Sequence, residues 1–187
     1  MADDVLILID QQKAKEHPKW GPRNNPDAER NIARLLAAWR ARGGPIIHVR
    51  HDSTYPDSPF RPGQSGNDFS PLTAPLPGEA VVAKRVTSAF IGTDLEARLQ
   101  KLGKPPLVIC GWLLANSVEA TVRVGANLGF SIRLSADACW SCDKRDLTGR
   151  LWLAEDVHQL TLALLNGDYA TVASVDEILG STGGGTE

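Results

Sequence analysis

Three polar side chains stand where predicted strands end. Asp10 closes the run LILID, Lys84 closes the run AVVAK, and Ser117 begins a segment of helical period after the run LVICG. Because ligands of open parallel sheets bind at the carboxyl ends of the strands, we expect these residues to lie close together. The unpaired N–H groups of a helix N-terminus stabilise negative charge. A carboxylate, an ammonium group and a hydroxyl in this setting are the parts of a nucleophilic site.

Each of these residues also has an ordinary structural interpretation. An acidic residue after a strand often forms a turn, and a lysine at a strand end often extends its ammonium group to water. A serine at the start of a helix is often a cap. Asp10 and Lys84 on neighbouring strand ends nevertheless form a credible charge pair.

Aliphatic runs alternate with segments of helical period, which is typical of βαβ units around a parallel sheet. The predicted strands are Val5–Asp10, Pro45–Arg50, Ala80–Lys84, Leu107–Gly111, Ser131–Leu134 and Thr171–Ser174. The predicted helices are centred on Ile32–Trp39, Gly92–Leu102 with Thr93 as a cap, Asn116–Leu128 and Thr148–Leu165. We therefore predict an α/β fold of three layers, Rossmann-like, with a parallel sheet of about six strands and helices on both faces.

The length of 187 residues favours one domain, which we place at residues 1–179, followed by a flexible glycine-rich tail at residues 180–187. The segment Asp52–Gly78 is rich in proline and lacks a sustained period, so we interpret it as a lid over the site. The residues that we expect to bind substrate are Trp20, Tyr55, Phe60, Arg61, Gln64, Trp112 and Asn116.

The composition argues against several classes of protein. Twenty basic and 22 acidic residues leave a formal net charge of -2, which does not favour nucleic acid as a partner. No apolar run approaches the ~20 residues that cross a bilayer, and no signal peptide is recognisable, so we expect a cytoplasmic protein without a membrane partner. Cys139 and Cys142 have the spacing of a thiol redox pair, but no strand-to-helix junction supports that role, and Cys110 is expected in the core.

Three ordered motifs, LILIDQQ, AKRVTSAFIGTDLEARL and VICGWLLANSVEATVRVGANLGF, resemble the isochorismatase-like (cysteine hydrolase) superfamily. The likeness extends from about Val5 to Leu179. It implies a catalytic triad at Asp10, Lys84 and position 117, acting on a C–N bond of a small amide, imide or ureide. It also implies a cis peptide bond between Trp112 and Leu113, and an oxyanion hole formed by the N–H groups of Leu113 and Ser117. The resemblance further implies a small-molecule substrate, no cofactor and a homo-oligomer, either a dimer or a tetramer.

The chain departs from the family pattern at Ser117, where the amidohydrolase members have cysteine. A free thiol has a pKa of about 8.5, whereas an aliphatic hydroxyl ionises far above physiological pH, so catalysis is expected to be impaired. Two explanations stay open: an engineered Cys-to-Ser variant that traps a ligand, which the intact surroundings favour, or a natural member that works slowly, differently or only as a binder. A vinyl-ether hydrolase resembling isochorismatase is a further alternative, because that chemistry needs the aspartate and no thiol.

The metal-dependent nicotinamidases of this superfamily have an Asp-x-His motif and a further histidine after the second strand. Here the corresponding segment contains His48, His51 and Asp52, and the next histidine is His158. We therefore expect neither a catalytic metal nor nicotinamide as the substrate.

Overall fold

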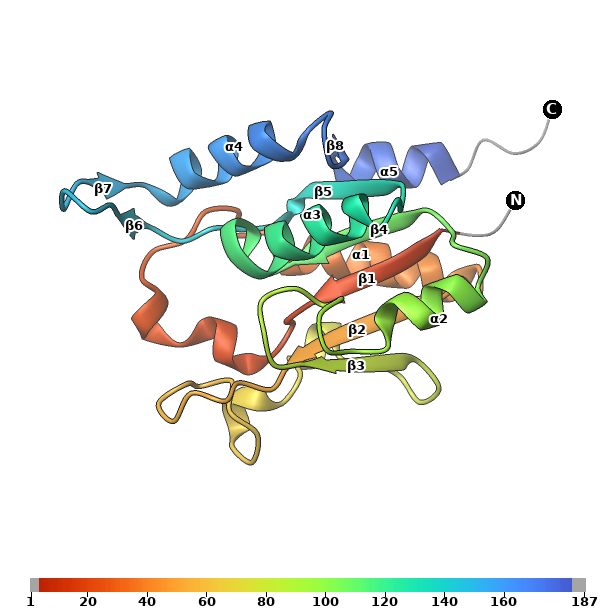
Figure 1. Ribbon diagram of the computed structural model, residues 1–187, viewed down its shortest axis with the longest axis horizontal. Coiled ribbons are helices and arrows are strands. Elements are labelled where there is room, and N and C mark those ends of the chain that lie inside the picture. Colours follow the sequence, from red (N-terminus) through yellow and green to blue (C-terminus); the bar gives the residue numbers. More distant parts are fainter. Residues whose placement is uncertain (1–3, 183–187) are drawn as a thin grey trace.

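The computed structural model describes residues 4–182, which form a six-stranded parallel sheet with helices on both faces (Figure 1). Its strands are β1 (Val5–Ile9), β2 (Ile46–His51), β3 (Ala80–Lys84), β4 (Leu107–Gly111), β5 (Ile132–Cys139) and β8 (Thr171–Ala173). The strand order is β3-β2-β1-β4-β5-β8, so the chain changes direction across the sheet between β1 and β4. This topology confirms the predicted Rossmann-like α/β fold and creates a switch point at which ligands of such sheets bind.

The helices are α1 (Ala28–Ala41), α2 (Leu95–Lys101), α3 (Glu119–Asn127), α4 (Ala154–Leu165) and α5 (Val175–Thr182). Helices α1 and α5 contact each other and β5, whereas α3 contacts α4 as well as β5. In Figure 1, α1 lies behind the sheet, and α2 and α3 lie in front of it. The sheet is therefore covered on both faces, as expected for strands with continuous apolar runs.

One apolar cluster fills the space between these layers. Every residue of β1 is buried, and α1 buries the predicted stripe formed by Ile32, Leu35, Leu36 and Trp39. Within residues 4–182, no helix is both long enough and apolar enough to cross a bilayer.

The predicted helix Thr148–Leu165 is wrong in its first turns. Residues Lys144–Arg145 (β6) and Leu151–Trp152 (β7) form an antiparallel hairpin, and α4 begins only at Ala154. The Asp146 carboxylate accepts hydrogen bonds from the Thr148 and Arg150 N–H groups and from the Trp152 indole. Such side-chain bonds to the backbone compete with helix formation, so the helix starts after the hairpin.

Three other boundaries also differ from the predictions. The predicted helix Asn116–Leu128 is a π-helical turn at Leu114–Val118 (η5) followed by α3, and the fifth strand extends to Cys139. Helix α2 begins two residues after the expected Thr93 cap, whose hydroxyl accepts a hydrogen bond from the Leu95 N–H.

Helix α5 was not predicted, and it includes residues 180–182 of the predicted tail. The remaining tail residues, 183–187, lie outside the described part of the chain.

Candidate active site

The end of β1, the end of β3 and the turn after β4 bring Asp10, Lys84 and Ser117 together. The Lys84 Nζ atom donates hydrogen bonds to Asp10 Oδ2 at 2.9 Å, to the Thr87 carbonyl oxygen at 2.9 Å and to Ser117 Oγ at 3.0 Å. Lys84 is completely buried, and the exposed fractions of Asp10 and Ser117 are 2% and 9%. The contact between the three predicted residues is thus direct.

These bonds determine which groups are left for a substrate. An ammonium group has three donors, and all three donors of Lys84 are used. Asp10 Oδ1 is buried and has no hydrogen-bond partner among the described residues, and Asp10 lines the adjacent cavity. A buried unpaired carboxylate oxygen is costly, so its position against a cavity indicates a group that meets a ligand or water.

The backbone has positive φ angles at the ends of β1 and β4, the two strands on either side of the switch point. Asp10 has a positive φ of 52°, which is uncommon for a residue other than glycine and turns its side chain out of the strand direction. Gly111 has a φ of 127°, and a Cβ atom there would lie 2.3 Å from the Ile9 carbonyl oxygen. Only glycine therefore lets β4 approach β1 so closely at this point. The peptide bond between Trp112 and Leu113 is cis.

A hydroxyl network fixes the start of the helix that carries Ser117. The Thr121 hydroxyl donates to the Ser117 carbonyl oxygen at 2.7 Å and accepts from the Ala89 N–H at 3.0 Å. This network ties η5 and α3 to the segment after β3, whose Thr87 carbonyl contacts Lys84. Leu113 and Ser117, the residues of the predicted oxyanion hole, both line the same cavity.

A cavity of about 680 Å³ opens beside Asp10 and Ser117. Five of the predicted substrate-binding residues line it: Trp20, Tyr55, Phe60, Trp112 and Asn116. The rings of Phe60 and Trp112 are stacked with centroids 5.4 Å apart, and the Trp20 ring meets Trp112 edge-on at 4.9 Å. The cavity thus combines an aromatic wall with a few polar groups, which is typical of small-molecule sites.

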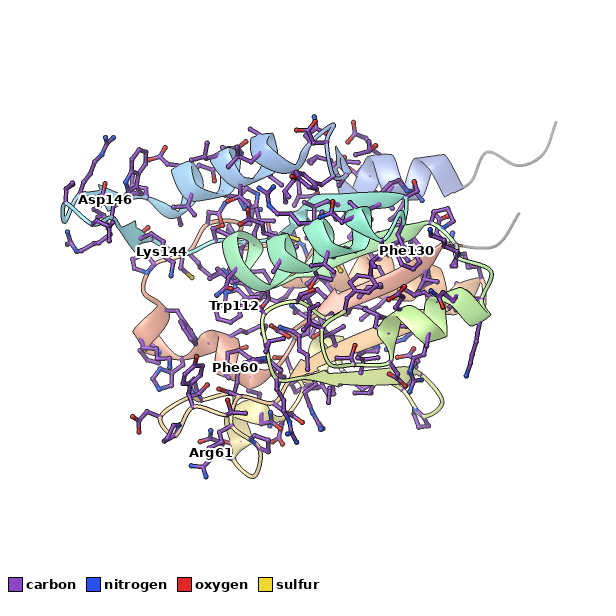
Figure 2. All side chains as sticks on the ribbon, in the orientation of Figure 1. Phe60, Arg61, Trp112, Phe130, Lys144 and Asp146 are labelled. Atoms are coloured by element: carbon purple, nitrogen blue, oxygen red, sulfur yellow. The ribbon has the colours of Figure 1, made fainter. Side chains whose placement is uncertain are left out.

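Two of the predicted binding residues lie elsewhere. Arg61 is exposed and points away from the aromatic wall (Figure 2), and it is absent from the cavity lining. Gln64 lines a separate surface hollow, and its amide donates to the Ser58 carbonyl oxygen. The structure therefore does not place these two side chains on the cavity beside Asp10.

The segment Asp52–Gly78 forms a wall of the cavity and is anchored by two amides. The Gln12 side chain bonds to the backbone of His51 and of Asn67. The Asn67 amide in turn donates to the carbonyl oxygens of His51 and Phe60. These contacts hold Phe60 against the aromatic wall. Gln12 and Asn67 were not predicted because an amide that bonds mainly to backbone groups leaves no recognisable sequence pattern.

His51 is a cavity-lining residue that was not among the predicted site residues. It is paired in register with Lys84, and its ring contacts Phe60 at 5.7 Å between centroids. The ring nitrogens make no hydrogen bond within residues 4–182, and Nδ1 is buried. Burial lowers the pKa of His51 below its ordinary value, and the Asp10 charge only partly opposes this effect. A neutral imidazole therefore faces the same space as Asp10. The sequence feature that could have identified His51 as a site residue is its position at the end of a predicted strand.

The histidines near β2 do not gather around a common point. The His48 ring lies against Phe69, and its Nε2 atom is 2.8 Å from Glu79 Oε2, away from the cavity lined by His51. Asp52 instead pairs with Arg50 at 2.9 Å. No set of three His, Cys, Asp or Glu side chains within residues 4–182 is arranged to hold a metal ion.

The three cysteines are free thiols buried in the protein. Burial raises the pKa of Cys139 to about 12 and that of Cys110 well above its ordinary value. Burial also raises the pKa of Cys142. Because the thiolate is the reactive form, these buried thiols are expected to act as packing groups rather than as a redox pair.

The fold and the site together define an α/β protein of hydrolase type, with a carboxylate, an ammonium group and a hydroxyl at the switch point of a parallel sheet. Residues 4–177 match the family model of the isochorismatase domain. The chain is therefore a hydrolase of the isochorismatase family, which confirms the resemblance in its motifs.

Individual relatives agree with this assignment over nearly the whole chain. The isochorismatase family protein YrdC of Bacillus subtilis is 36% identical over 94% of this chain and 94% of its own. The crystal structure of an isochorismatase-family protein from Chromobacterium violaceum is 51% identical, covers 98% of this chain and 95% of its own, and has a TM-score of 0.95. An isochorismatase from Pseudomonas putida is 37% identical over 94% of this chain and 90% of its own, with a TM-score of 0.86.

Proposed function

We propose that this chain hydrolyses a C–N bond in a small amide, imide or ureide, with Ser117 as the nucleophile. The observation that supports this proposal is the Lys84 ammonium group, which bonds to both Asp10 and Ser117. A nucleophile needs a group that stabilises negative charge and a nearby base; Lys84 supplies the first, and its bond to Asp10 keeps a carboxylate close by. A cavity of about 680 Å³ is of the right size for a small molecule.

The proposed reaction has two halves. The Ser117 hydroxyl gives its proton to the Asp10 carboxylate while Oγ bonds to the substrate carbonyl carbon, and the Leu113 and Ser117 N–H groups stabilise the resulting oxyanion. The C–N bond then breaks as the leaving nitrogen takes the proton from Asp10, which leaves an acyl ester on Ser117. A water molecule gives a proton to Asp10 and bonds to the ester carbon. Collapse returns that proton to Ser117 Oγ and releases the acid.

We expect this form of the protein to be slow. Lys84 donates a hydrogen bond to Ser117 Oγ and thereby favours its negative charge. A hydroxyl nevertheless ionises far less readily than a thiol, whose free pKa is about 8.5. A cysteine at position 117 would meet the same ammonium group and the same helix start, and it would supply a thiolate at neutral pH.

A second candidate is vinyl-ether hydrolysis, in which Asp10 protonates a carbon and water completes the cleavage. The observation that favours it is Asp10 Oδ1, which is buried without a partner in a residue that lines an aromatic-walled cavity. This chemistry needs no nucleophile at position 117. A third outcome is a protein that binds such molecules without turning them over.

Three variants distinguish these candidates: Ser117→Cys, Ser117→Ala and Asp10→Asn. Turnover of a panel of small amides, imides, ureides and vinyl ethers is measured with each, and intact-protein mass spectrometry records adducts. We expect Ser117→Cys to raise C–N hydrolysis at least tenfold and to form a transient acyl adduct, whereas Ser117→Ala and Asp10→Asn abolish it.

Vinyl-ether hydrolysis that survives Ser117→Ala and is lost in Asp10→Asn would instead establish the second candidate. If Ser117→Cys shows neither turnover nor adduct across the panel, the proposed C–N chemistry is wrong. Circular dichroism of each variant establishes that the fold is retained.

A further inference from the structure

Three cations line the cavity beside the candidate active site: Lys19, Arg85 and Lys144. They come from distant parts of the chain. Lys19 lies in the short 3-10 turn Pro18–Trp20 (η2), Arg85 directly follows β3, and Lys144 lies on β6. The fold therefore gathers positive charge around one space, although no motif of the sequence links these residues.

No carboxylate of the protein neutralises these cations. Within residues 4–182, none of the three forms an ion pair. Exposed arginines elsewhere are paired, as Arg34 is with Asp176 and Arg98 with Asp94. The Lys19 ammonium group lies over the Trp20 ring, 4.5 Å from its centroid, and this contact leaves its charge in place. The cations of the cavity are thus available to an anion from outside.

The acidic residues of the cavity do not balance this charge. Asp10 and Asp57 are the acidic residues among those that line it in the described chain. Asp10 is already paired with Lys84, and Asp57 can balance only one of the three cations. The cavity therefore has an excess of positive charge, whereas the whole chain has a formal net charge of -2. Charge of one sign in a cleft raises the local concentration of ligands of the opposite sign.

The burial of the lining residues separates the reacting groups from the cations. Asp10 and Ser117 are buried, whereas Lys19, Arg85 and Lys144 are exposed. The reacting groups therefore lie at the floor of the cavity, and the cations lie at its mouth. A ligand that reaches from floor to mouth has the bond that is cleaved at one end and meets the positive charge with the other.

The surface between floor and mouth indicates what the middle of such a ligand is. The rings of Trp20, Phe60 and Trp112 contact one another and line the cavity. Figure 2 shows Lys144, Trp112 and Phe60 along the same side of the molecule. Aromatic rings favour an apolar segment, because burying apolar surface is favourable whereas burying an unpaired polar group is costly.

We propose that Lys19, Arg85 and Lys144 form an anion subsite, which selects substrates that carry a carboxylate at the end opposite the bond that is cleaved. The inference rests on the proposed function, because it names the substrate class of the same site. Arg85 is the principal residue, since a planar guanidinium group binds a carboxylate through two parallel hydrogen bonds and a lysine acts as a point charge. The simplest compounds of this class are monoamides of dicarboxylic acids.

Binding is measured by isothermal titration calorimetry on the Ser117→Ala protein, so that turnover of the amide does not interfere. The probes are succinamate, glutaramate and adipamate, each compared with the neutral diamide of the same chain length. We expect at least one carboxylate to bind at least tenfold more tightly than its diamide, which is the scale of one charge-assisted hydrogen bond. Sodium chloride should weaken binding of the carboxylate and leave that of the diamide unchanged, because salt screens exposed charges.

A pair of charge-matched double variants tests the residues. Arg85→Gln with Lys144→Gln, made in the Ser117→Ala protein, should remove the preference for the carboxylate. The control is Arg145→Gln with Lys101→Gln, which removes one exposed arginine and one exposed lysine outside the cavity lining. The control should keep the preference. Circular dichroism of both double variants checks that they fold.

A kinetic measurement separates binding from chemistry. In the Ser117→Cys protein, Arg85→Gln should raise KM for the carboxylate at least tenfold and leave kcat nearly unchanged, which is the pattern of a group that binds ground state and transition state equally. The kinetic constants for the diamide should not change. A loss of kcat for both compounds would show a structural effect and contradict a selective subsite.

The anion subsite is overturned if carboxylates and diamides bind equally or if the preference survives in the folded Arg85→Gln, Lys144→Gln protein. Absence of binding of all three carboxylates at ~10 mM, above the usual range of KM values, also contradicts it. The two proposals fail separately. A carboxylate preference without amide turnover by Ser117→Cys supports the subsite and contradicts C–N hydrolysis, whereas equal turnover of carboxylates and diamides does the reverse.

Discussion

At the scale of single residues, Asp10 is not the only group on the cavity that can bind a proton. His51 lies in register with Lys84 on the next strand, and neither of its ring nitrogens is occupied within the described chain. Its pKa is lowered chiefly by burial, so the imidazole is neutral at and above its ordinary value of 6.5. A neutral imidazole can accept a hydrogen bond from the water that attacks the ester on Ser117, and can so assist the proton transfer from that water to Asp10.

We therefore predict that His51→Gln slows turnover by ~10²-fold, the usual scale of general-base catalysis. The rate of the unaltered enzyme should fall as the pH drops through the pKa of His51, which lies below the ordinary value of 6.5, because a protonated imidazole cannot accept this hydrogen bond. This acid limb should be absent from the pH profile of His51→Gln. Exposed His17→Gln serves as the control and should keep the limb. A His51→Gln profile identical to that of the unaltered enzyme would exclude a proton-transfer role.

Sequence reasoning located Asp10, Lys84 and Ser117 because strand ends converge in any parallel sheet. It did not foresee that Arg61 and Gln64 lie off the cavity lining, because a loop without periodicity does not reveal which way its side chains point. His51 was considered only as a metal ligand, and its unoccupied ring could be recognised only from the surroundings. Residue type and spacing therefore predict the centre of the site better than its walls.

At the scale of elements, the close approach of β1 and β4 depends on Gly111. We predict that Gly111→Ala lowers the free energy of unfolding by about 2–6 kcal/mol, from backbone strain and overpacking together. The added methyl group would meet the Ile9 carbonyl oxygen at 2.3 Å, and backbone atoms cannot move aside cheaply. Urea denaturation measures the change.

The matched control is Gly180→Ala in α5, where an added Cβ atom has no neighbour within 4 Å. This change should stabilise the protein slightly, since alanine is favoured over glycine in helices by about 1 kcal/mol. Equal effects of the two substitutions would show that the tight packing between β1 and β4 carries no special cost.

The hairpin that sequence reasoning missed has a local physical cause. The apolar spacing of Leu153, Leu160 and Leu164 extends the helical period, but Asp146 binds the backbone of the preceding turn and turns it into a hairpin. Local side-chain bonds of this kind override periodicity. Five of the six strands of the parallel sheet, by contrast, were predicted to within one residue because their apolar runs are continuous and clearly bounded, whereas β5 extends five residues beyond its predicted end.

At the scale of the whole molecule, three buried histidines make stability depend on pH. Burial lowers the pKa of His48, His51 and His158 below the ordinary value of 6.5. The unfolded chain therefore binds protons near pH 6.5 that the folded chain does not. The stabilisation contributed by the three neutral histidines is fully present above pH 6.5. It is lost as the pH falls from 6.5 through their lowered folded-state pKa values. The side-chain hydrogen bond from Arg40, the largest influence on Glu79, helps to hold the pKa of that carboxyl at about 2, so Glu79 adds little to this change between pH 7 and 5 and loses its stabilising effect mainly below pH 5.

We predict that the free energy of unfolding decreases steadily from pH 7 to pH 5 in urea titrations. His158→Asn should make this slope shallower, and exposed His17→Asn should leave it unchanged. A stability that is independent of pH over this range would show that the buried imidazoles take up protons as readily as those of the unfolded chain.

The aromatic wall of the cavity has a spectroscopic consequence. Two of the five tryptophans, Trp20 and Trp112, border the space that a ligand would enter, whereas Trp39 and Trp140 are completely buried. Indole fluorescence shifts in wavelength and intensity when water beside the ring is replaced. The enzyme thus contains an intrinsic optical probe of its own occupancy, which reports a bound compound even when no product is ever released.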